Sequence, residues 1–147
     1  MQVKCHYSNL KITLRRGAAV KAVQLLDTIL KKKWLSSNTV REGLIACFTL
    51  TLTHYAKEAP LSRLEQVLGE NKVSHLDEDV IYSKVLQTAQ YGFRAMKIDD
   101  EYPTKDQLLK LKAIMEEHLQ ISKLKEDYPA LFNEHHRLTQ TLLDKME

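Results

Sequence analysis

The sequence contains few residues that break or cross-link a chain. Among 147 residues there are four glycines, three prolines and two cysteines. Scarce glycine and proline favour long helices. Cys5 and Cys47 are too few for a disulfide framework and form no CxxC motif. We therefore predict a helical protein of a reducing compartment, the cytoplasm, with a Cys5–Cys47 bridge as the alternative.

Long hydrophobic runs are also missing. The most apolar stretch, residues 43–52, is about ten residues long, whereas a helix needs about 20 to span a bilayer. The N-terminus lacks the uninterrupted apolar core of a signal peptide. We predict no membrane partner, and we expect Cys47, which lies in this run, to be a buried and inert thiol.

Motifs for catalysis and metal binding are absent. The sequence has no GxSxG, Walker A, GxGxxG or HExxH motif, and none of its six histidines lies three residues after a glutamate. The pairs Glu117-His118 and Glu134-His135 are adjacent, so their side chains point in different directions on a helix. We predict no enzyme, no cofactor and no metal. A meeting of His118 and His135 between two helices is the alternative.

Positive charge is concentrated at the start of the chain. Residues 1–41 contain nine basic residues and one acid, Asp27, for a net charge of +8. Residues 42–147 contain 13 basic and 18 acidic residues, for a net charge of −5. The formal charge of +3 for the whole chain hides this polarity. A basic surface attracts polyanions or acidic protein surfaces.

Apolar residues recur at three- and four-residue steps along most of the chain, which is typical of helices. We predict a mainly α fold: a single-domain helical bundle of five to six helices over residues 1–147. Residues 2–14 alternate between apolar and polar, which predicts a short N-terminal β-hairpin or arm over residues 1–16, with a helix after Ser8 as the alternative. The predicted helices cover residues 18–35, 39–57, 61–68, 76–97, 104–124 and 129–146.

Local signals place the ends and faces of these helices. Thr39–Glu42, Ser74–Asp77 and Thr104–Gln107 have the spacing of capping boxes. The helix over 39–57 is apolar on most sides, so we expect it at the centre of the bundle. Trp34 falls on the apolar side of the first helix, which predicts that it packs in the core, with stacking on a nucleic-acid base as the alternative.

The last two helices are joined by a short turn at Asp127–Pro129. Residues 104–147 are therefore predicted to form an antiparallel helical hairpin. Both helices are amphipathic, so we expect that a homodimer could form through this C-terminal hairpin.

The basic segment carries the functional prediction. We expect a small non-enzymatic helical protein that binds nucleic acid, or a nucleoprotein complex, through its N-terminal basic surface. The alternative is a protein–protein adaptor or inhibitor that docks on an acidic protein surface without nucleic-acid contact. Lys31–Lys33 also have a purely structural explanation: positive side chains at the C-terminal end of the first helix interact favourably with the negative end of its dipole. The predicted contact residues are Arg15, Arg16, Lys21, Lys31, Lys32 and Lys33.

Overall fold

The computed structural model describes residues 17–59, 78–99 and 101–146. Within these ranges the regular secondary structure is helical, apart from an isolated bridge between Leu35 and Met146. The prediction of a mainly α helical bundle is confirmed. The described helices are α2 (Ala18–Leu30), α3 (Ser37–Glu58), α5 (Glu78–Met96), α6 (Lys105–His118), α7 (Ile121–Asp127) and α8 (Pro129–Asp144).

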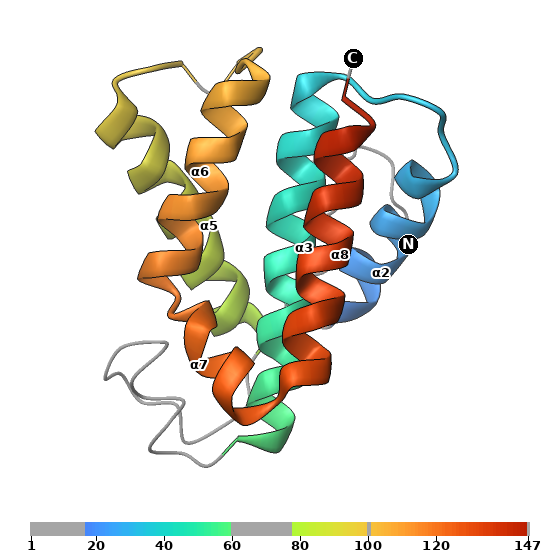
Figure 1. The fold of residues 1–147 in the computed structure, drawn as a ribbon, viewed down its shortest axis with the longest axis vertical. Helices are drawn as coiled ribbons and strands as arrows, with labels where there is room; N and C mark the ends of the chain where they lie inside the picture. The colour runs from blue at the N-terminus through green and yellow to red at the C-terminus, as the bar shows by residue number, and fades with distance from the viewer. Residues whose placement is uncertain (1–16, 60–77, 100, 147) are drawn as a thin grey trace.

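Helix α3 is the centre of the bundle, as predicted. Thirteen of its 22 residues are buried. In Figure 1, α3 and α8 run side by side, with α2 on one side of the pair and α6 on the other. Helix α5 lies next to α6 and crosses behind α3, so that its first residue, Glu78, accepts a hydrogen bond from the Ala19 N–H of α2 at 3.0 Å. A Cβ atom added to Gly43 of α3 would lie 2.8 Å from Ile29 Cδ1 and 2.9 Å from Leu142 Cδ2. Glycine at this position therefore lets α2 and α8 pack closely against α3.

The start of α3 differs from the prediction. Ser36, not Thr39, is the N-cap, and its hydroxyl accepts a hydrogen bond from the Thr39 backbone N–H at 3.2 Å. Thr39 lies inside the first turn, because the helix begins at Ser37. The predicted end was right, since α3 stops at Glu58, two residues before Pro60.

Helix α2 is shorter than predicted, and its buried face differs from the stripe that the sequence predicts, which consists of Ala19, Val23, Leu26, Leu30 and Trp34. It ends at Leu30, and its buried face is made of Ala18, Ala22, Leu26 and Ile29. The predicted position of Trp34 in the core is wrong, because this side chain is 60% exposed. The chain leaves the helix before Trp34 and instead buries Leu35, whose backbone N–H donates to the Lys145 carbonyl at 2.7 Å.

The predicted helix over 104–124 is two helices. The capping box at its start is confirmed, since Gln107 N–H donates to Thr104 Oγ1 at 3.1 Å and Thr104 N–H to Gln107 Oε1 at 2.8 Å. The break follows His118, where Gln120 adopts a left-handed conformation with φ of 53°. Few non-glycine residues adopt this conformation, and nothing in the sequence marks the site.

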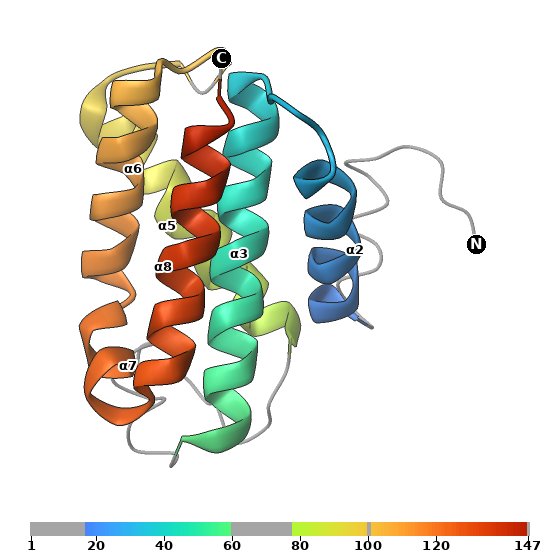
Figure 2. The ribbon, with the colours of Figure 1, turned by 45° about the vertical axis from the view of Figure 1, so that its right-hand side comes forward.

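The C-terminal helices use their apolar faces within the chain. Helix α8 begins at Pro129, as predicted, and lies along α3 (Figure 2). Its Leu138, Leu142 and Leu143 are part of the core, together with Leu108 and Leu111 of α6. A homodimer through the predicted hairpin at 104–147 stays a prediction. These buried leucines would not take part in its interface, because they already pack in the core of one chain.

Several predictions lie outside the described residues. They are the hairpin or arm over 1–16, Arg15, Arg16, Cys5, the helix over 61–68 and the capping box at Ser74–Asp77. Of the helices that are described, none is long and apolar enough to cross a bilayer.

Candidate functional site

The connection between α2 and α3 brings together three lysines and the single tryptophan of the chain. Lys31, Lys32 and Lys33 are exposed, and Trp34 is exposed over 60% of its surface. We call these four residues the 31–34 loop. Figure 1 shows the connection at the outer edge of the bundle, at the end of α2. Residues 28–41 contain no acid, so no carboxylate within this stretch neutralises the lysines.

The backbone on both sides of this loop is held by residue Lys145. Leu35, which follows the loop, is buried and donates its backbone N–H to the Lys145 carbonyl. The Lys145 ammonium donates hydrogen bonds to the carbonyls of Leu30, at 3.1 Å, and Lys32, at 2.7 Å. Lys145 thus binds carbonyls left open at the C-terminal end of α2. The last turn of α2 contains no basic residue, but Lys31 is the C-cap and Lys32 and Lys33 follow it directly, so the structural explanation for Lys31–Lys33 stays a prediction.

The other predicted contact residues are not assembled around this loop. Lys21 is half-buried in the first turns of α2. It precedes Lys31 by ten residues, which corresponds to about 15 Å along a helix axis. Arg15 and Arg16 lie outside the described residues. The structure thus groups Lys31, Lys32 and Lys33 and separates Lys21 from them.

Sequence reasoning left two residues of this site out of the predicted contacts: it preferred a core position for Trp34, and it missed Lys145. Trp34 was assigned to the core because helical periodicity was extended through Lys31–Lys33. Lys145 lies 113 residues from Lys32 and has no local signal that links it to α2. The run of lysines after Leu30 could have indicated an exposed turn before Trp34.

A second polar cluster lies inside the bundle around His135 of α8. The imidazole is 1% exposed. Its Nε2 lies 3.2 Å from Glu116 Oε2 of α6, and its Nδ1 lies 3.1 Å from Thr51 Oγ1 of α3. Phe48 contacts the ring edge-on, with 4.6 Å between ring centroids. Both ring nitrogens therefore have partners, which a buried histidine needs.

The thiol in this cluster is not a nucleophile. Cys47 Sγ lies 3.9 Å from His135 Nδ1, but the side chain is fully buried. Burial raises the pKa of the Cys47 thiol to about 12, which outweighs the opposite effect of its hydrogen bond with Thr51. A neutral, inaccessible thiol is unreactive. The prediction that Cys47 is buried is confirmed, and its low reactivity stays a prediction.

Glu116 differs from Cys47 because its carboxylate has a lysine ammonium and an imidazole hydrogen-bond partner beside it. Burial alone would raise the pKa of its carboxyl, but the hydrogen bond with His135 and the ammonium of Lys112, at 3.1 Å, lower it below its usual value. Glu116 is therefore ionised at neutral pH. The resulting Lys112–Glu116–His135–Thr51 chain connects α6, α8 and α3.

His118 and His135 do not share a site. His118 contacts Tyr91 of α5, with ring centroids 4.7 Å apart, whereas His135 binds Glu116 and Thr51. Across residues 17–59, 78–99 and 101–146, no group of three histidine, cysteine or carboxylate side chains is placed to hold a metal ion. The predicted alternative of a site between these two histidines is wrong.

Comparisons with known proteins give no relative: no protein-family model, no curated protein and no solved structure matches the chain.

Proposed function

We propose that the protein is a small helical, non-enzymatic protein that binds single-stranded nucleic acid, free or within a nucleoprotein complex, through the 31–34 loop. The observation that carries the proposal is an exposed indole directly after three exposed lysines. Tryptophan side chains are enriched at interfaces, because one end of the ring is apolar and the other can donate a hydrogen bond, so the exposed position of Trp34 is consistent with contact to a partner.

The two kinds of side chain serve different parts of a nucleic acid. The ammonium groups of Lys31, Lys32 and Lys33 neutralise phosphates and release counterions. The indole of Trp34 offers a flat surface on which an unpaired base can stack, an interaction that contributes about 1–3 kcal/mol per base. Stacking and phosphate contact are tolerant of sequence, so we expect binding without strong sequence preference.

Single strands suit this loop better than a duplex. Bases in a duplex are stacked on each other, and an aromatic side chain reaches their faces only at ends, bulges or unpaired segments. The loop holds its lysines next to the indole, so backbone and base of one strand can be contacted together. Lys21, Arg15 and Arg16 belong to the same basic segment of the sequence and stay predicted secondary contacts.

The proposal is tested by fluorescence anisotropy with labelled single-stranded DNA, single-stranded RNA and a duplex over a range of salt concentrations. Affinity is expected to fall steeply with salt. For single strands the slope of log K against log salt is about −0.7 per neutralised phosphate, so replacing Lys31, Lys32 and Lys33 by glutamine makes it shallower by about 2.

A matched variant controls for net charge. Lys57 of α3 and Lys105 and Lys110 of α6 are exposed and outside the loop. Their replacement by glutamine removes the same charge and leaves the affinity and the slope close to those of the wild type. If no oligonucleotide binds at low salt, the proposal is overturned. Capture of an acidic protein that survives nuclease treatment then favours the adaptor alternative.

A further inference from the structure

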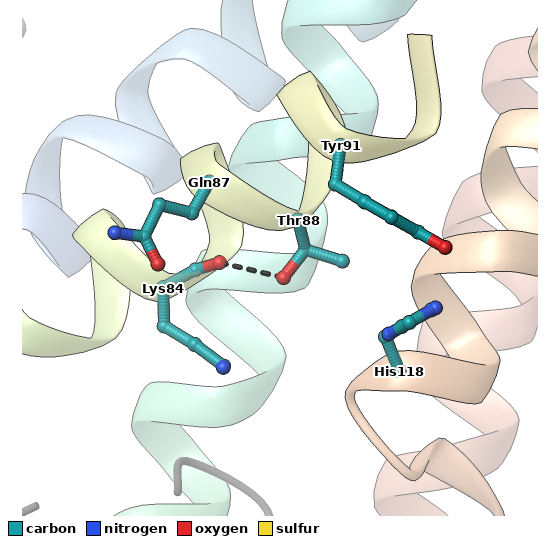
Figure 3. Close-up of a pocket in the computed structure, with 5 residues that line it drawn as sticks. All are labelled: Lys84, Gln87, Thr88, Tyr91 and His118. Carbon is teal, nitrogen blue, oxygen red and sulfur yellow. Dashed lines mark hydrogen bonds between the residues drawn. The ribbon is translucent and has the colours of Figure 1, made fainter. Parts of the chain in front are cut away.

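A polar hollow lies between α5 and α6, away from the 31–34 loop. Its volume is about 180 Å³. Four of its lining residues come from α5 and one, His118, from α6 (Figure 3). One water needs about 10–15 Å³ of such volume, so the hollow has room for a ligand larger than several waters. The lining residues are Lys84, Gln87, Thr88, Tyr91 and His118.

Regular helix geometry brings these side chains together. Lys84, Gln87, Thr88 and Tyr91 follow each other at steps of three, four and seven residues from Lys84, so they share one face of α5. Helix α6 lies close to this face, because a Cβ atom added to Gly92 would lie 2.7 Å from Leu111 Cδ1.

The polar groups of the hollow are available for a ligand. Among the described residues, none accepts or donates a hydrogen bond to Lys84 Nζ, the Gln87 amide or the Tyr91 hydroxyl, and none forms an ion pair with Lys84. Thr88 is different, since its hydroxyl donates to the Lys84 carbonyl at 2.7 Å. The Tyr91 ring contacts the His118 ring at a tilt of 59°, which limits the orientations of the imidazole (Figure 3).

We propose that this hollow binds a small oxoanion of the phosphate class, free or as a phosphomonoester. Lys84 supplies a permanent positive charge, and Gln87, Tyr91 and His118 supply N–H and O–H donors. None of the five lining residues is acidic, so no carboxylate in the lining repels an anion. Charged hydrogen bonds from an ammonium to phosphate oxygens are among the stronger ones in proteins.

The site is independent of the proposed nucleic-acid surface. Helices α3 and α8 lie between the α5–α6 pair and the connection that contains the 31–34 loop (Figure 1). The two proposals therefore rest on different residues, and a negative result for one does not affect the other. Replacement of Lys84 is expected to leave the affinity for oligonucleotides unchanged.

Titration of the full chain with inorganic phosphate, followed by NMR of the histidine ring resonances, tests the proposal. Ionic strength is held constant with chloride, and His118→Asn assigns the His118 signal. We expect a saturable change at His118 with millimolar affinity, and no comparable change at His136, which is exposed on α8. A parallel titration with phenyl phosphate shows whether an aryl group on the ligand adds affinity through Tyr91.

Two variants decide whether the hollow is responsible. Lys84→Met keeps most of the aliphatic stem and removes the charge. We expect this variant to bind phosphate about tenfold more weakly or worse, because it loses one charged hydrogen bond. Lys110→Met removes the same charge from an exposed position on α6 outside the hollow and leaves binding unchanged. Circular dichroism confirms that both variants are folded. A linear, non-saturating response, or equal weakening by the two variants, overturns the proposal.

Discussion

His135 Nε2 lies 3.2 Å from Glu116 Oε2, and this contact joins α8 to α6 at the edge of an apolar core. The imidazole side chain is fully buried, whereas 28% of the Glu116 side chain is exposed. The glutamate thus connects a buried ring to the solvent. Because Thr51 binds the other ring nitrogen, loss of either partner leaves a buried nitrogen unsatisfied.

The stability of the protein is expected to fall below pH 4.5 through Glu116. The pKa of Glu116 in the folded protein lies below its ordinary value of 4.5. Its contribution is therefore complete above 4.5 and is lost as the pH falls through the lower folded pKa. Glu116→Gln lowers the free energy of unfolding at neutral pH by about 1–2 kcal/mol and removes this part of the acid dependence.

Urea denaturation at several pH values measures both effects. Glu117→Gln, at the exposed neighbouring position, serves as the control and keeps the wild-type pH dependence. Equal pH dependence in Glu116→Gln and in the wild type contradicts the role given to Glu116.

His135 is expected to contribute more to stability than its neighbour His136. Replacement of His135 by alanine opens a cavity and removes the hydrogen-bond partner of Thr51 and one of the two partners of Glu116, which keeps Lys112. We therefore expect a loss of about 3 kcal/mol in the free energy of unfolding. His136 is exposed, and its replacement by alanine costs less than about 0.5 kcal/mol. A double-mutant cycle with Glu116→Gln gives a coupling energy of about 0.5–3 kcal/mol if the two side chains interact as described.

Cys47 is expected to resist thiol reagents in the folded protein. In a Cys5→Ser background, DTNB reacts with Cys47 only when the protein unfolds, because the thiol is buried and its pKa is raised to about 12. The reaction rate should therefore rise with urea in parallel with the unfolded fraction. Rapid reaction without denaturant would show that the site opens while the bundle stays folded.

Lys145 is expected to order the 31–34 loop. Lys145→Met removes two hydrogen bonds to the carbonyls of Leu30 and Lys32, with a loss of about 1 kcal/mol in stability. The affinity for single strands falls several-fold, because the loop must then be ordered on binding. The control is Lys110→Met, which removes one exposed charge from α6. A loss of affinity equal in the two variants contradicts this role.

Local sequence signals were sufficient for much of the fold. The apolar residues on most sides of the helix predicted over 39–57 indicated a central helix, and α3 has this position. The Thr104–Gln107 capping box and the break at Asp127–Pro129 were also predictable, because each depends on neighbouring residues only.

Features that depend on distant contacts were not predictable. Helix α2 has apolar residues on two overlapping stripes, and the sequence alone favoured the stripe with Val23 and Trp34. The observed stripe packs against α3, where Gly43 allows Ile29 to approach closely. The burial of Leu35 depends on a backbone hydrogen bond with the distant Lys145. The partners of His135, which lie 19 and 84 residues away along the chain, could not be identified from local spacing either.

The most direct test of the central claim uses the fluorescence of Trp34, the only tryptophan in the chain. Addition of single-stranded DNA or RNA is expected to quench this emission in a saturable way, because a base stacks on the exposed indole. Replacement of Lys31, Lys32 and Lys33 by glutamine shifts the titration to higher concentrations, and added salt reverses the quenching. Tryptophan emission that stays unchanged while the oligonucleotide binds would contradict the account, since Trp34 would then lie outside the interface.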